Sequence, residues 1–481
     1  MNTADALPTR CEVLVVGSGA GGATTAAVLA EAGLDVVVVE EGEWIAQGEI
    51  VPFSLEQMER QYRSGGVTVA LGRPGIAYTE GRCVGGGTEI NSGLYRRPPA
   101  DVLDRWRDQY GIADFAPEEF DSIADEVEEE LSVRTVPGAV TPSSGLLRDG
   151  SDALGWRQSE IPRWMEYPEG GSATSGRRRS MTETYLPRAR RAGARVVSGC
   201  RVRRLREAGR GVVVDVEVAG ARREVLADHV FVCGGAIQTP ALLQRSGLRR
   251  DVGASLAIHP TVKLSARFPD EVNVGDDVPV HQVKEFAPNL SFGGSASHPG
   301  LLALALSDEW PQFGQVVESW RHMSVFYAAI TSEGRGRVDA LPGFQDPVVT
   351  YRLTRRDRDL LRAGLNRLAL VMLEAGATEV YPSYRGAPVV RGRRDLADLA
   401  ARFSANRASV MTVHLCSTVP MGESERCPVD SFGAVKAADR ITVNDASLLP
   451  DAPGVNPQAA VMAIAIRNAR HFAARRSGGR T

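Results

Sequence analysis

The pattern of apolar runs and glycine turns is clearest near the N-terminus. Residues 11–16 (CEVLVV) form a short apolar run bounded by glycines, which is typical of a buried strand in a parallel sheet. An alanine-rich segment with apolar residues at helical spacing follows and ends at Gly33. Residues 35–40 (DVVVVE) form a second buried strand. A strand, glycine turn, helix and strand within about 30 residues predict a βαβ unit.

Further elements recur along the chain and change in character near residue 260. The pattern predicts strands at 196–206, 212–218 and 228–233 and helices at 355–377 and 457–475. These strands indicate that the first sheet resumes near residue 190. From about 260 to 350 the chain changes to short strands, aromatic residues and turns. We therefore expect an α/β protein with a second domain of different construction.

Composition narrows the possible functions. The 481 residues are 43% hydrophobic, which is enough for two or three domains with cores of their own. The 56 basic and 59 acidic residues give a net charge of −3, so no basic excess indicates nucleic acid or an anionic membrane as a partner. The six cysteines form no CxxC pair, which argues against a disulfide scaffold and a structural zinc site, and we expect no metal. There is no apolar run of about 18 residues and no signal sequence, so the expected location is the cytoplasm, with no membrane span.

The glycine turn after the first strand fits the GxGxxG pattern. Gly17 permits the tight turn, Gly19 lets the backbone approach a pyrophosphate, and Gly22 lets the helix pack closely on the strand. The pyrophosphate would lie at the helix N-terminus, where free N–H groups and the helix dipole favour negative charge. Glu40 ends the next strand, where its carboxylate would accept hydrogen bonds from a ribose diol and repel a 2′-phosphate. This pattern argues against NADP and is compatible with both FAD and NAD.

Several later motifs point to one family. They are 81–91 (GRCVGGGTEIN), 235–247 (GAIQTPALLQRSG), 257–260 (AIHP), 350–357 (TYRLTRRD), 414–422 (HLCSTVPMG), 443–450 (VNDASLLP) and 454–457 (GVNP). In this order and spacing they resemble the signatures of the glucose–methanol–choline (GMC) flavin oxidoreductases. The resemblance extends from about residue 11 to 472.

The resemblance implies a bipartite architecture. A Rossmann-type FAD-binding domain would be assembled from residues 1–150, 190–258 and 411–481. Residues 259–410 would form a substrate-binding domain, built on a largely antiparallel sheet backed by helices. Residues 151–189 would connect the two parts or form a lid.

The resemblance also implies one FAD per chain, bound without a covalent link. Ile90 stands where certain relatives carry the histidine that bonds to the flavin, and Cys83 is not expected to replace it. The residues implied to contact the cofactor are Gly17, Gly19, Gly22, Glu40, Arg82, Gly85, Gly86, Asn91, Val202, Gly235, Asp445, Ala446, Asn456 and Pro457.

For catalysis, the resemblance implies that a hydride passes from the carbinol carbon of an alcohol to flavin N5. His414 would accept the hydroxyl proton, since a histidine of ordinary pKa is mostly neutral near pH 7 and the rate would then rise through an ionisation near pH 6–7. Asn456 would hold the hydroxyl through its amide. The other histidines are expected to be structural or exposed, with His259 packing before a proline.

Two further expectations concern the backbone. Pro457 is expected to be the first residue of the last helix, whose N-terminus would face the N1–C2=O edge of the flavin. Ser417 replaces a glycine that the family usually carries after the catalytic histidine, so the turn there is expected to differ.

The expected function is FAD-dependent oxidation of a small-molecule alcohol, such as a sugar, polyol or natural-product alcohol. The electron acceptor would be O2 or another carrier. The alternative is a hydroxynitrile lyase on the same fold, against which Asn456 argues because the lyase branch carries a histidine pair; an NAD dehydrogenase is disfavoured by the later motifs. Trp310, Trp320, Phe326 and Tyr327 lie in the expected substrate domain, where core packing is favoured over cavity lining for most of them.

Overall fold

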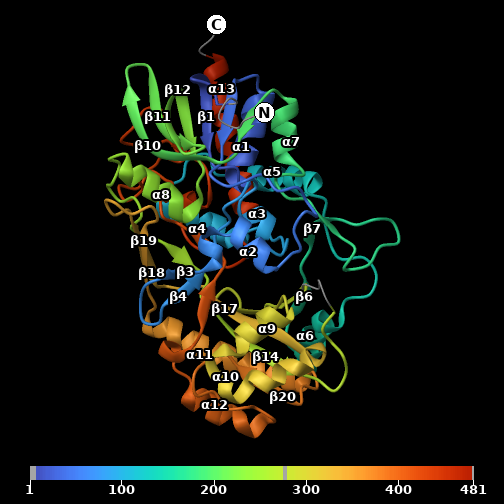
Figure 1. The fold of residues 1–481 in the computed structure, drawn as a ribbon. Coiled ribbons are helices and arrows are strands. Elements are labelled where there is room, and N and C mark those ends of the chain that lie inside the picture. The colour runs from blue at the N-terminus through green and yellow to red at the C-terminus, as the bar shows by residue number, and fades with distance from the viewer. Residues whose placement is uncertain (1–6, 275–278, 479–481) are drawn as a thin grey trace.

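Two large β-sheets occupy opposite ends of the molecule (Figure 1). The computed structural model describes residues 7–274 and 279–478. The N- and C-terminal segments both lie at the end that carries the first sheet, at the top of Figure 1. The chain passes from the first sheet to the second and back twice, because β1–β2 (10–39), β9–β12 (195–232) and β23 (441–443) belong to the first sheet and the segments between them contribute strands to the second.

The first sheet combines a parallel centre with an antiparallel flank. Within the described ranges its strands run in the order β10 (Cys200–Ala208), β11 (Gly211–Val218), β12 (Ala221–Val232), β1 (Arg10–Val16), β2 (Val36–Val39) and β9 (Arg195–Val197), and β23 (Ile441–Val443) also pairs with β12. Pairing is parallel from β12 through β1 and β2 to β9, and antiparallel between β10, β11 and β12. The four valines of β2 are all buried, as expected for a strand covered on both faces. The predicted βαβ unit is confirmed.

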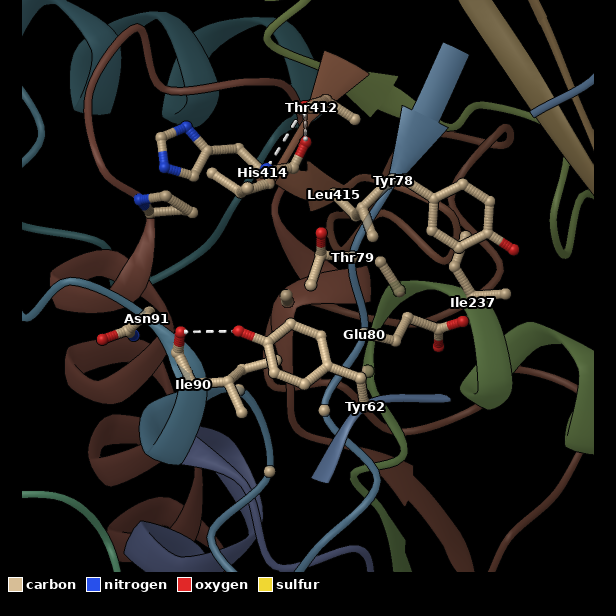
Figure 2. A pocket seen from close by; sticks show the side chains of 18 of the residues that line it. Tyr62, Tyr78, Thr79, Glu80, Ile90, Asn91, Ile237, Thr412, His414 and Leu415 are labelled. Atoms are coloured by element: carbon tan, nitrogen blue, oxygen red, sulfur yellow. Dashed lines mark hydrogen bonds between the residues drawn. The ribbon is translucent and has the colours of Figure 1, made fainter. Parts of the chain in front are cut away.

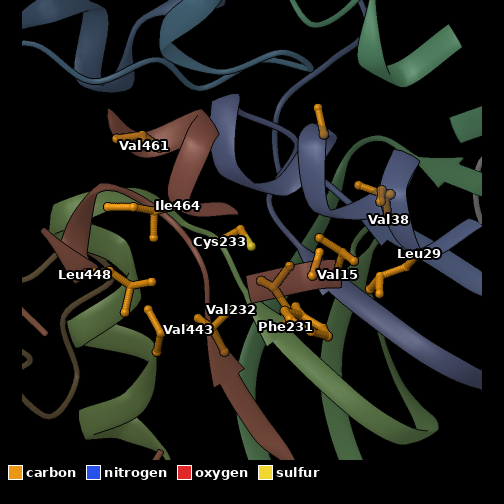
Figure 3. Close-up of a cluster of buried hydrophobic side chains, with 14 of the residues drawn as sticks. Val15, Leu29, Val38, Phe231, Val232, Cys233, Val443, Leu448, Val461 and Ile464 are labelled. Carbon is orange, nitrogen blue, oxygen red and sulfur yellow. The ribbon is translucent and has the colours of Figure 1, made fainter. Parts of the chain in front are cut away.

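Helices from both ends of the chain cover this sheet. Figure 3 shows side chains from β1, β12, β23, α1 (Ala20–Glu31) and α13 (Gln458–Gly478) meeting in one cluster. Val15, Phe231 and Ile464 in this cluster are almost fully buried. Because the C-terminal helix packs in the same core as the N-terminal strand, the first and last segments stabilise each other.

The second sheet is mostly antiparallel. Within the described ranges its strands run in the order β3 (Thr68–Ala70), β4 (Ile76–Tyr78), β21 (Val410–Thr412), β14 (Thr261–Arg267), β17 (Met323–Ile330), β16 (Leu290–Ser295), β15 (His281–Val283) and β6 (Gln158–Glu160), and β20 (Glu379–Pro382) also pairs with β14. The helix α11 (Arg355–Glu374) packs on β17 and β14. It begins with a capping box in which the Thr354 side chain accepts from the Asp357 N–H and Asp357 accepts from the Thr354 N–H.

The boundary between the two parts differs from the sequence expectation. Residues 68–78 form β3 and β4, and 158–160 form β6, all three in the second sheet. The sequence places the first of these segments in the FAD-binding domain and the last in a connecting segment. Each strand is three residues long, too short to show a period, and the pairings that join β4 and β6 to the rest of the sheet are distant in sequence, as in the parallel pairing of Ile76 with Val410.

The remaining helices and strands complete the described part of the fold. Further helices are α2 (Leu55–Gln61), α3 (Gly87–Ile90), α4 (Ala100–Tyr110), α5 (Pro117–Glu130), α6 (Pro142–Ala153), α7 (Tyr185–Arg191), α8 (Gly235–Arg245), α9 (Pro299–Leu306), α10 (Trp310–Phe313) and α12 (Leu396–Arg402). Further strands are β5 (Val133–Arg134), β7 (Arg163–Glu166), β8 (Arg177–Arg178), β13 (Ala257–Ile258), β18 (Arg335–Asp339), β19 (Val348–Arg352) and β22 (Leu415–Cys416). Among the described helices, none combines the length and the apolar character that crossing a bilayer requires.

Candidate active site

A single cavity of about 1050 Å³ connects the two parts of the fold. Its lining begins at the glycine turn after β1, passes His414 and Asn456, and ends at residues of the second sheet such as Lys263 and Gln282. Ordinary small-molecule sites have volumes of roughly 300–1,000 Å³. The cavity is therefore large enough for a dinucleotide at one end and a second ligand at the other.

The glycine turn leaves room for a ligand. Gly17 has a φ of +98°, and a Cβ on it would lie 2.4 Å from the carbonyl oxygen of Cys233, so only glycine fits. At Gly19 an added Cβ would meet no protein atom closer than 3.9 Å. Protein packing thus requires the first glycine but not the second, which faces the cavity at the N-terminus of α1. This is the arrangement that a pyrophosphate needs, and the residues fit FAD.

Glu40 lies beside the same turn. One carboxylate oxygen accepts from the N–H of Ser18 at 3.0 Å and from its hydroxyl at 2.8 Å, and the other accepts from the N–H of Gly42 at 3.0 Å. Burial raises the pKa of Glu40, while these hydrogen bonds oppose the shift. Glu40 therefore fixes the turn as well as lining the cavity where the ribose is expected.

Replacing Glu40 with glutamine is expected to weaken FAD binding by about 10- to 100-fold. The Glu40 carboxylate accepts three hydrogen bonds, and the NH2 group of a glutamine would face at least one of these donors with a donor of its own. Glu43→Gln is the matched control, since Glu43 pairs with Arg60 away from the cavity. Fluorescence titration of FAD into the apoprotein measures both. Equal weakening in the two variants would contradict the assignment of Glu40.

Most of the expected cofactor-binding residues line the cavity. They are Gly17, Gly19, Glu40, Gly86, Asn91, Val202, Gly235, Asp445, Ala446, Asn456 and Pro457. Gly22, Gly85 and Arg82 do not line it. Gly22 packs against Gly17, as expected, and the Gly85 N–H donates to the hydroxyl of Ser18. The Arg82 side chain is instead about half exposed, and its Nε atom lies 3.6 Å from the carboxylate of Glu41, which lines the cavity.

The second glycine cluster forms the opposite wall. A Cβ on Gly86 would lie 3.0 Å from Cα of Gly19, so the two glycine segments face each other. Asn91 donates to the side chain of Gln458 at 2.8 Å and joins this wall to α13. Ile90, in the same segment, is buried, and the Tyr62 hydroxyl donates to its carbonyl oxygen (Figure 2). Cys83 is buried, which raises the pKa of its thiol and keeps it protonated.

Strand register places two histidines opposite each other. The strands β13 and β22 pair antiparallel, with Ala257 opposite Cys416 and Ile258 opposite Leu415. The next pair in this register is His259 and His414. Their Nδ1 atoms lie 2.9 Å apart, and the Nε2 atom of His259 accepts from the N–H of Gly454 at 3.1 Å. His259 lines the cavity and binds the catalytic candidate directly, so the expectation that it is a packing residue is wrong.

Two hydrogen bonds at the ends of the histidine pair favour different proton positions. The Gly454 N–H can only donate, so it favours His259 with its proton on Nδ1 and, in turn, His414 with its proton on Nε2. At the other end, the Asn456 amide nitrogen lies 3.4 Å from Nε2 of His414 and favours an unprotonated Nε2. Both preferences cannot hold while each ring carries one proton. Which nitrogen atom carries the proton in each ring therefore depends on what else contacts His414.

Burial keeps both rings neutral. The pKa of His414 is lowered to about 4 by burial and, to a smaller extent, by the nearby Lys284. The pKa of His259 is also lowered, first by burial and then by His414. His414 is consequently neutral over the whole range above about pH 5, and its ionisation does not lie near pH 6–7 as the sequence led us to expect.

The backbone around His414 is more specialised than the sequence suggests. The His414 N–H donates to the hydroxyl of Thr412 at 3.2 Å (Figure 2). Ser417 has a φ of +68°, the region that glycine favours, and its hydroxyl donates to the carbonyl of Pro450 at 2.7 Å. Ser417 thus adopts a backbone conformation that glycine favours, and the hydrogen bond offsets part of the strain.

The last helix begins one residue later than expected. α13 starts at Gln458, and Pro457 precedes it and accepts the N–H of Val461 through its carbonyl at 3.0 Å. Both Pro457 and Gln458 line the cavity. The N-terminus of this helix therefore faces the same cavity as His414.

Sequence reasoning missed the substrate end of the cavity. Lys263, Gln282 and Lys284 line it, as does Tyr327, whereas Phe326 next to it on β17 is buried in the core. The alternation of side chains along a strand places these two aromatic residues on opposite faces.

The signal that could have identified His259 was its place in the His-Pro motif.

Comparisons with known proteins agree with this geometry. Two family models described as GMC oxidoreductase match residues 58–261 and 331–465, and a model described as an FAD binding domain matches 10–49. An uncharacterized GMC-type oxidoreductase of Sinorhizobium fredii is 39% identical over 475 residues, covering 96% of this chain and 94% of that protein. A long-chain-alcohol oxidase of Arabidopsis thaliana is 26% identical, covering 96% of this chain and 67% of that protein.

Solved structures share the fold. A pyridoxine 4-oxidase from Mesorbium loti superposes with a TM-score of 0.72 at 20% identity, covering 96% of this chain and 99% of that one. A formate oxidase of Aspergillus oryzae superposes with a TM-score of 0.73 at 16% identity, covering 98% and 99%. With the family models and the 39% identical relative, these findings show that the chain belongs to the GMC family of FAD-dependent oxidoreductases.

Proposed function

We propose that the protein oxidises the hydroxyl group of a small-molecule alcohol to a carbonyl. The observation that carries the proposal is the pair of His414 and Asn456, which lies on the wall of the same cavity as the glycine turn, with 3.4 Å between the amide nitrogen and Nε2. This pair can hold a hydroxyl, and it stands between the expected cofactor end and the second sheet. The alcohol oxidase among the relatives supports the same reaction class.

In the proposed reaction the alcohol loses a hydride from its carbon and a proton from its oxygen. FAD, which the glycine turn after β1 and Glu40 would hold, would supply the two-electron acceptor for this hydride. Asn456 positions the hydroxyl oxygen, and Nε2 of His414 accepts the proton as the carbonyl bond forms. The N-terminus of α13 lies at this cavity, where its dipole favours negative charge.

Proton acceptance requires the tautomer of His414 with its own proton on Nδ1. The bond from Gly454 to His259 opposes this tautomer, whereas the Asn456 amide supports it. A substrate hydroxyl can donate to the single lone pair of Nε2 in place of the Asn456 amide, and this hydrogen bond, worth about 1 kcal/mol, supports the same tautomer while the amide holds the hydroxyl oxygen. We propose that substrate binding in this way selects the proton-accepting form of His414, with His259 as a positioning residue.

The proposal predicts that an accepted alcohol bleaches the yellow flavin of the holoenzyme under anaerobic conditions. The loss of flavin absorbance is measured for each compound in a screen of sugars, polyols, aromatic alcohols and hydroxy acids. Cleavage of a cyanohydrin without any bleaching would instead identify a hydroxynitrile lyase. Reoxidation of the bleached enzyme by O2 or by an artificial acceptor then distinguishes an oxidase from a dehydrogenase.

A further inference from the structure

The floor of the cavity at its substrate end is one face of the second sheet. Across neighbouring strands, Lys263 on β14 lies opposite Tyr327 on β17, which lies opposite Gly293 on β16, which lies opposite Gln282 on β15. Side chains opposite each other in a sheet share a face. Lys263, Tyr327 and Gln282 accordingly all line the cavity.

The glycine in this row lets the tyrosine lie across it. A Cβ on Gly293 would come within 2.3 Å of the Tyr327 hydroxyl oxygen. Because glycine has no Cβ, the Tyr327 hydroxyl lies over position 293, where the side-chain amide of Gln282 donates to it at 3.1 Å. The amide oxygen of Gln282 has no hydrogen-bond partner among the described residues. The floor is thus a built, polar surface with hydrogen-bonding capacity left over.

Lys284 lies directly beyond the end of the strand that carries Gln282. It follows Val283, the last residue of β15, and it lines the same cavity. It is near enough to His414 and His259 to lower the pKa of both. Lys284 therefore lies on the side of the floor that faces the reacting hydroxyl.

Lysine is rare in this chain. Of its 56 basic residues, the only lysines are Lys263, Lys284 and Lys436. The third bonds the backbone carbonyls of Gly422 and Ser424 and does not line the cavity. A chain that uses arginine almost everywhere has placed two of its three lysines at the substrate end.

The basic groups at this end have no acidic partner. Neither Lys263 nor Lys284 forms an ion pair within the described ranges, and Lys263 donates only to the hydroxyl of Ser295, at 3.2 Å. The charge of Arg96 contributes to lowering the pKa of Lys284, and the Arg96 guanidinium donates to the hydroxyl of Ser159 rather than to a carboxylate. The carboxylates that line the cavity are Glu40, Glu41, Glu80 and Asp445, all on the cofactor side and all bonded there.

An amine suits such a place better than a guanidinium. Burial lowers the pKa of Lys263 to about 8 and that of Lys284 to about 7, so each can release its proton when nothing compensates its charge. Arginine cannot do so. A negatively charged ligand would restore both protons, since an opposite charge favours the charged form of an amine.

We propose that the alcohol substrate carries a negatively charged group, a carboxylate or a phosphate, that is bound by Lys284 with support from Lys263. The inference rests on the proposed alcohol oxidation and names the substrate class for it. The hydroxyl end of such a substrate reaches His414 and Asn456, while its anionic end lies against the sheet floor.

Matched alcohols test the proposal on the FAD-loaded enzyme. The pair is 4-(hydroxymethyl)benzoate and its neutral isostere 4-(hydroxymethyl)benzamide, with 4-(hydroxymethyl)phenyl phosphate as the third arm. The measured quantity is the ratio of kcat/KM between acid and amide. We expect the ratio to exceed ten at pH 6.5, to fall toward pH 9 as the amines lose their protons, and to drop at least tenfold in Lys284→Met. The phosphate arm tells which anion is preferred.

A binding measurement gives a second readout that needs no turnover. Benzoate, but not benzamide, should perturb the flavin absorbance and take up protons on binding near pH 8, as measured by calorimetry in buffers of different ionisation enthalpy. Lys436→Met is the matched control and should keep the wild-type preference.

The outcomes separate the two proposals. If no alcohol reduces the flavin, the proposed function fails, while benzoate binding still tests the anion site. If alcohols reduce the flavin with a ratio near one, or if Lys284→Met slows acid and amide equally, Lys284 serves the flavin or the fold and the anion proposal is overturned.

Discussion

Replacing His414 with alanine is expected to slow anaerobic reduction of the flavin by an accepted alcohol by about 10²- to 10⁴-fold, the usual contribution of a positioned proton acceptor. FAD content should not change, because His414 lies beyond the glycine turn and Glu40, which are expected to hold the cofactor. Rapid mixing in the absence of oxygen measures the reductive step directly. Reduction of His414→Ala at the wild-type rate would place the proton acceptor elsewhere.

The pH dependence of the wild-type enzyme gives an independent check. With its pKa lowered to about 4 by burial, His414 is neutral and able to accept a proton from about pH 5 upward. The loss of kcat/KM from its protonation should therefore appear only as the pH falls toward 4. A transition near pH 7 that disappears in Lys284→Met belongs to the lysine, whose pKa burial lowers to about 7.

The second large effect is expected from aspartate at position 456. An aspartate carboxylate can only accept, so it selects His414 with its proton on Nε2, the tautomer that the Gly454–His259 bond already favours. Its charge also raises the pKa of His414. Asn456→Asp should therefore slow the reductive step on the order of 10²-fold or more.

Asn456→Ala is the matched comparison. It removes the support for the proton-accepting tautomer without opposing it, and its loss should be about 10-fold, the value of one hydrogen bond. Both rates come from the same anaerobic mixing experiment. If the aspartate variant is no slower than the alanine variant, the tautomer of His414 does not control the rate.

The elements that sequence reasoning predicted are those with a strong local pattern. β1, β2, α1 and the glycine turn between them follow from apolar runs and glycine positions alone. α11 has a clear helical period and a capping box, and it was expected within three residues of its observed end. These signals are local because hydrogen bonds and turn geometry within about 30 residues determine them.

The pairings that position chemistry could not be read in this way. His259 and His414 meet through a two-residue antiparallel pairing between β13 and β22, separated by more than 150 residues in the chain. Such a short pairing leaves no periodic trace in the sequence. The same holds for Lys263, Tyr327 and Gln282, which share a row only because of the order in which β14, β17, β16 and β15 assemble.

Family resemblance identified His414 and Asn456, and the structure brings them together. It did not give the direction of the hydrogen bonds around them. That direction depends on the N–H of Gly454, a backbone group that no side-chain motif reveals.

The composition of the cavity wall also determines when the site can form during biosynthesis. The lining joins Gly17, near the start of the chain, to Pro457 and Gln458, which enter the last helix. A nascent chain that has released only its N-terminal βαβ unit offers a glycine turn without the opposite wall. FAD capture at the complete site therefore requires that the segment with Pro457 and Gln458 is translated and has packed against the glycine turn.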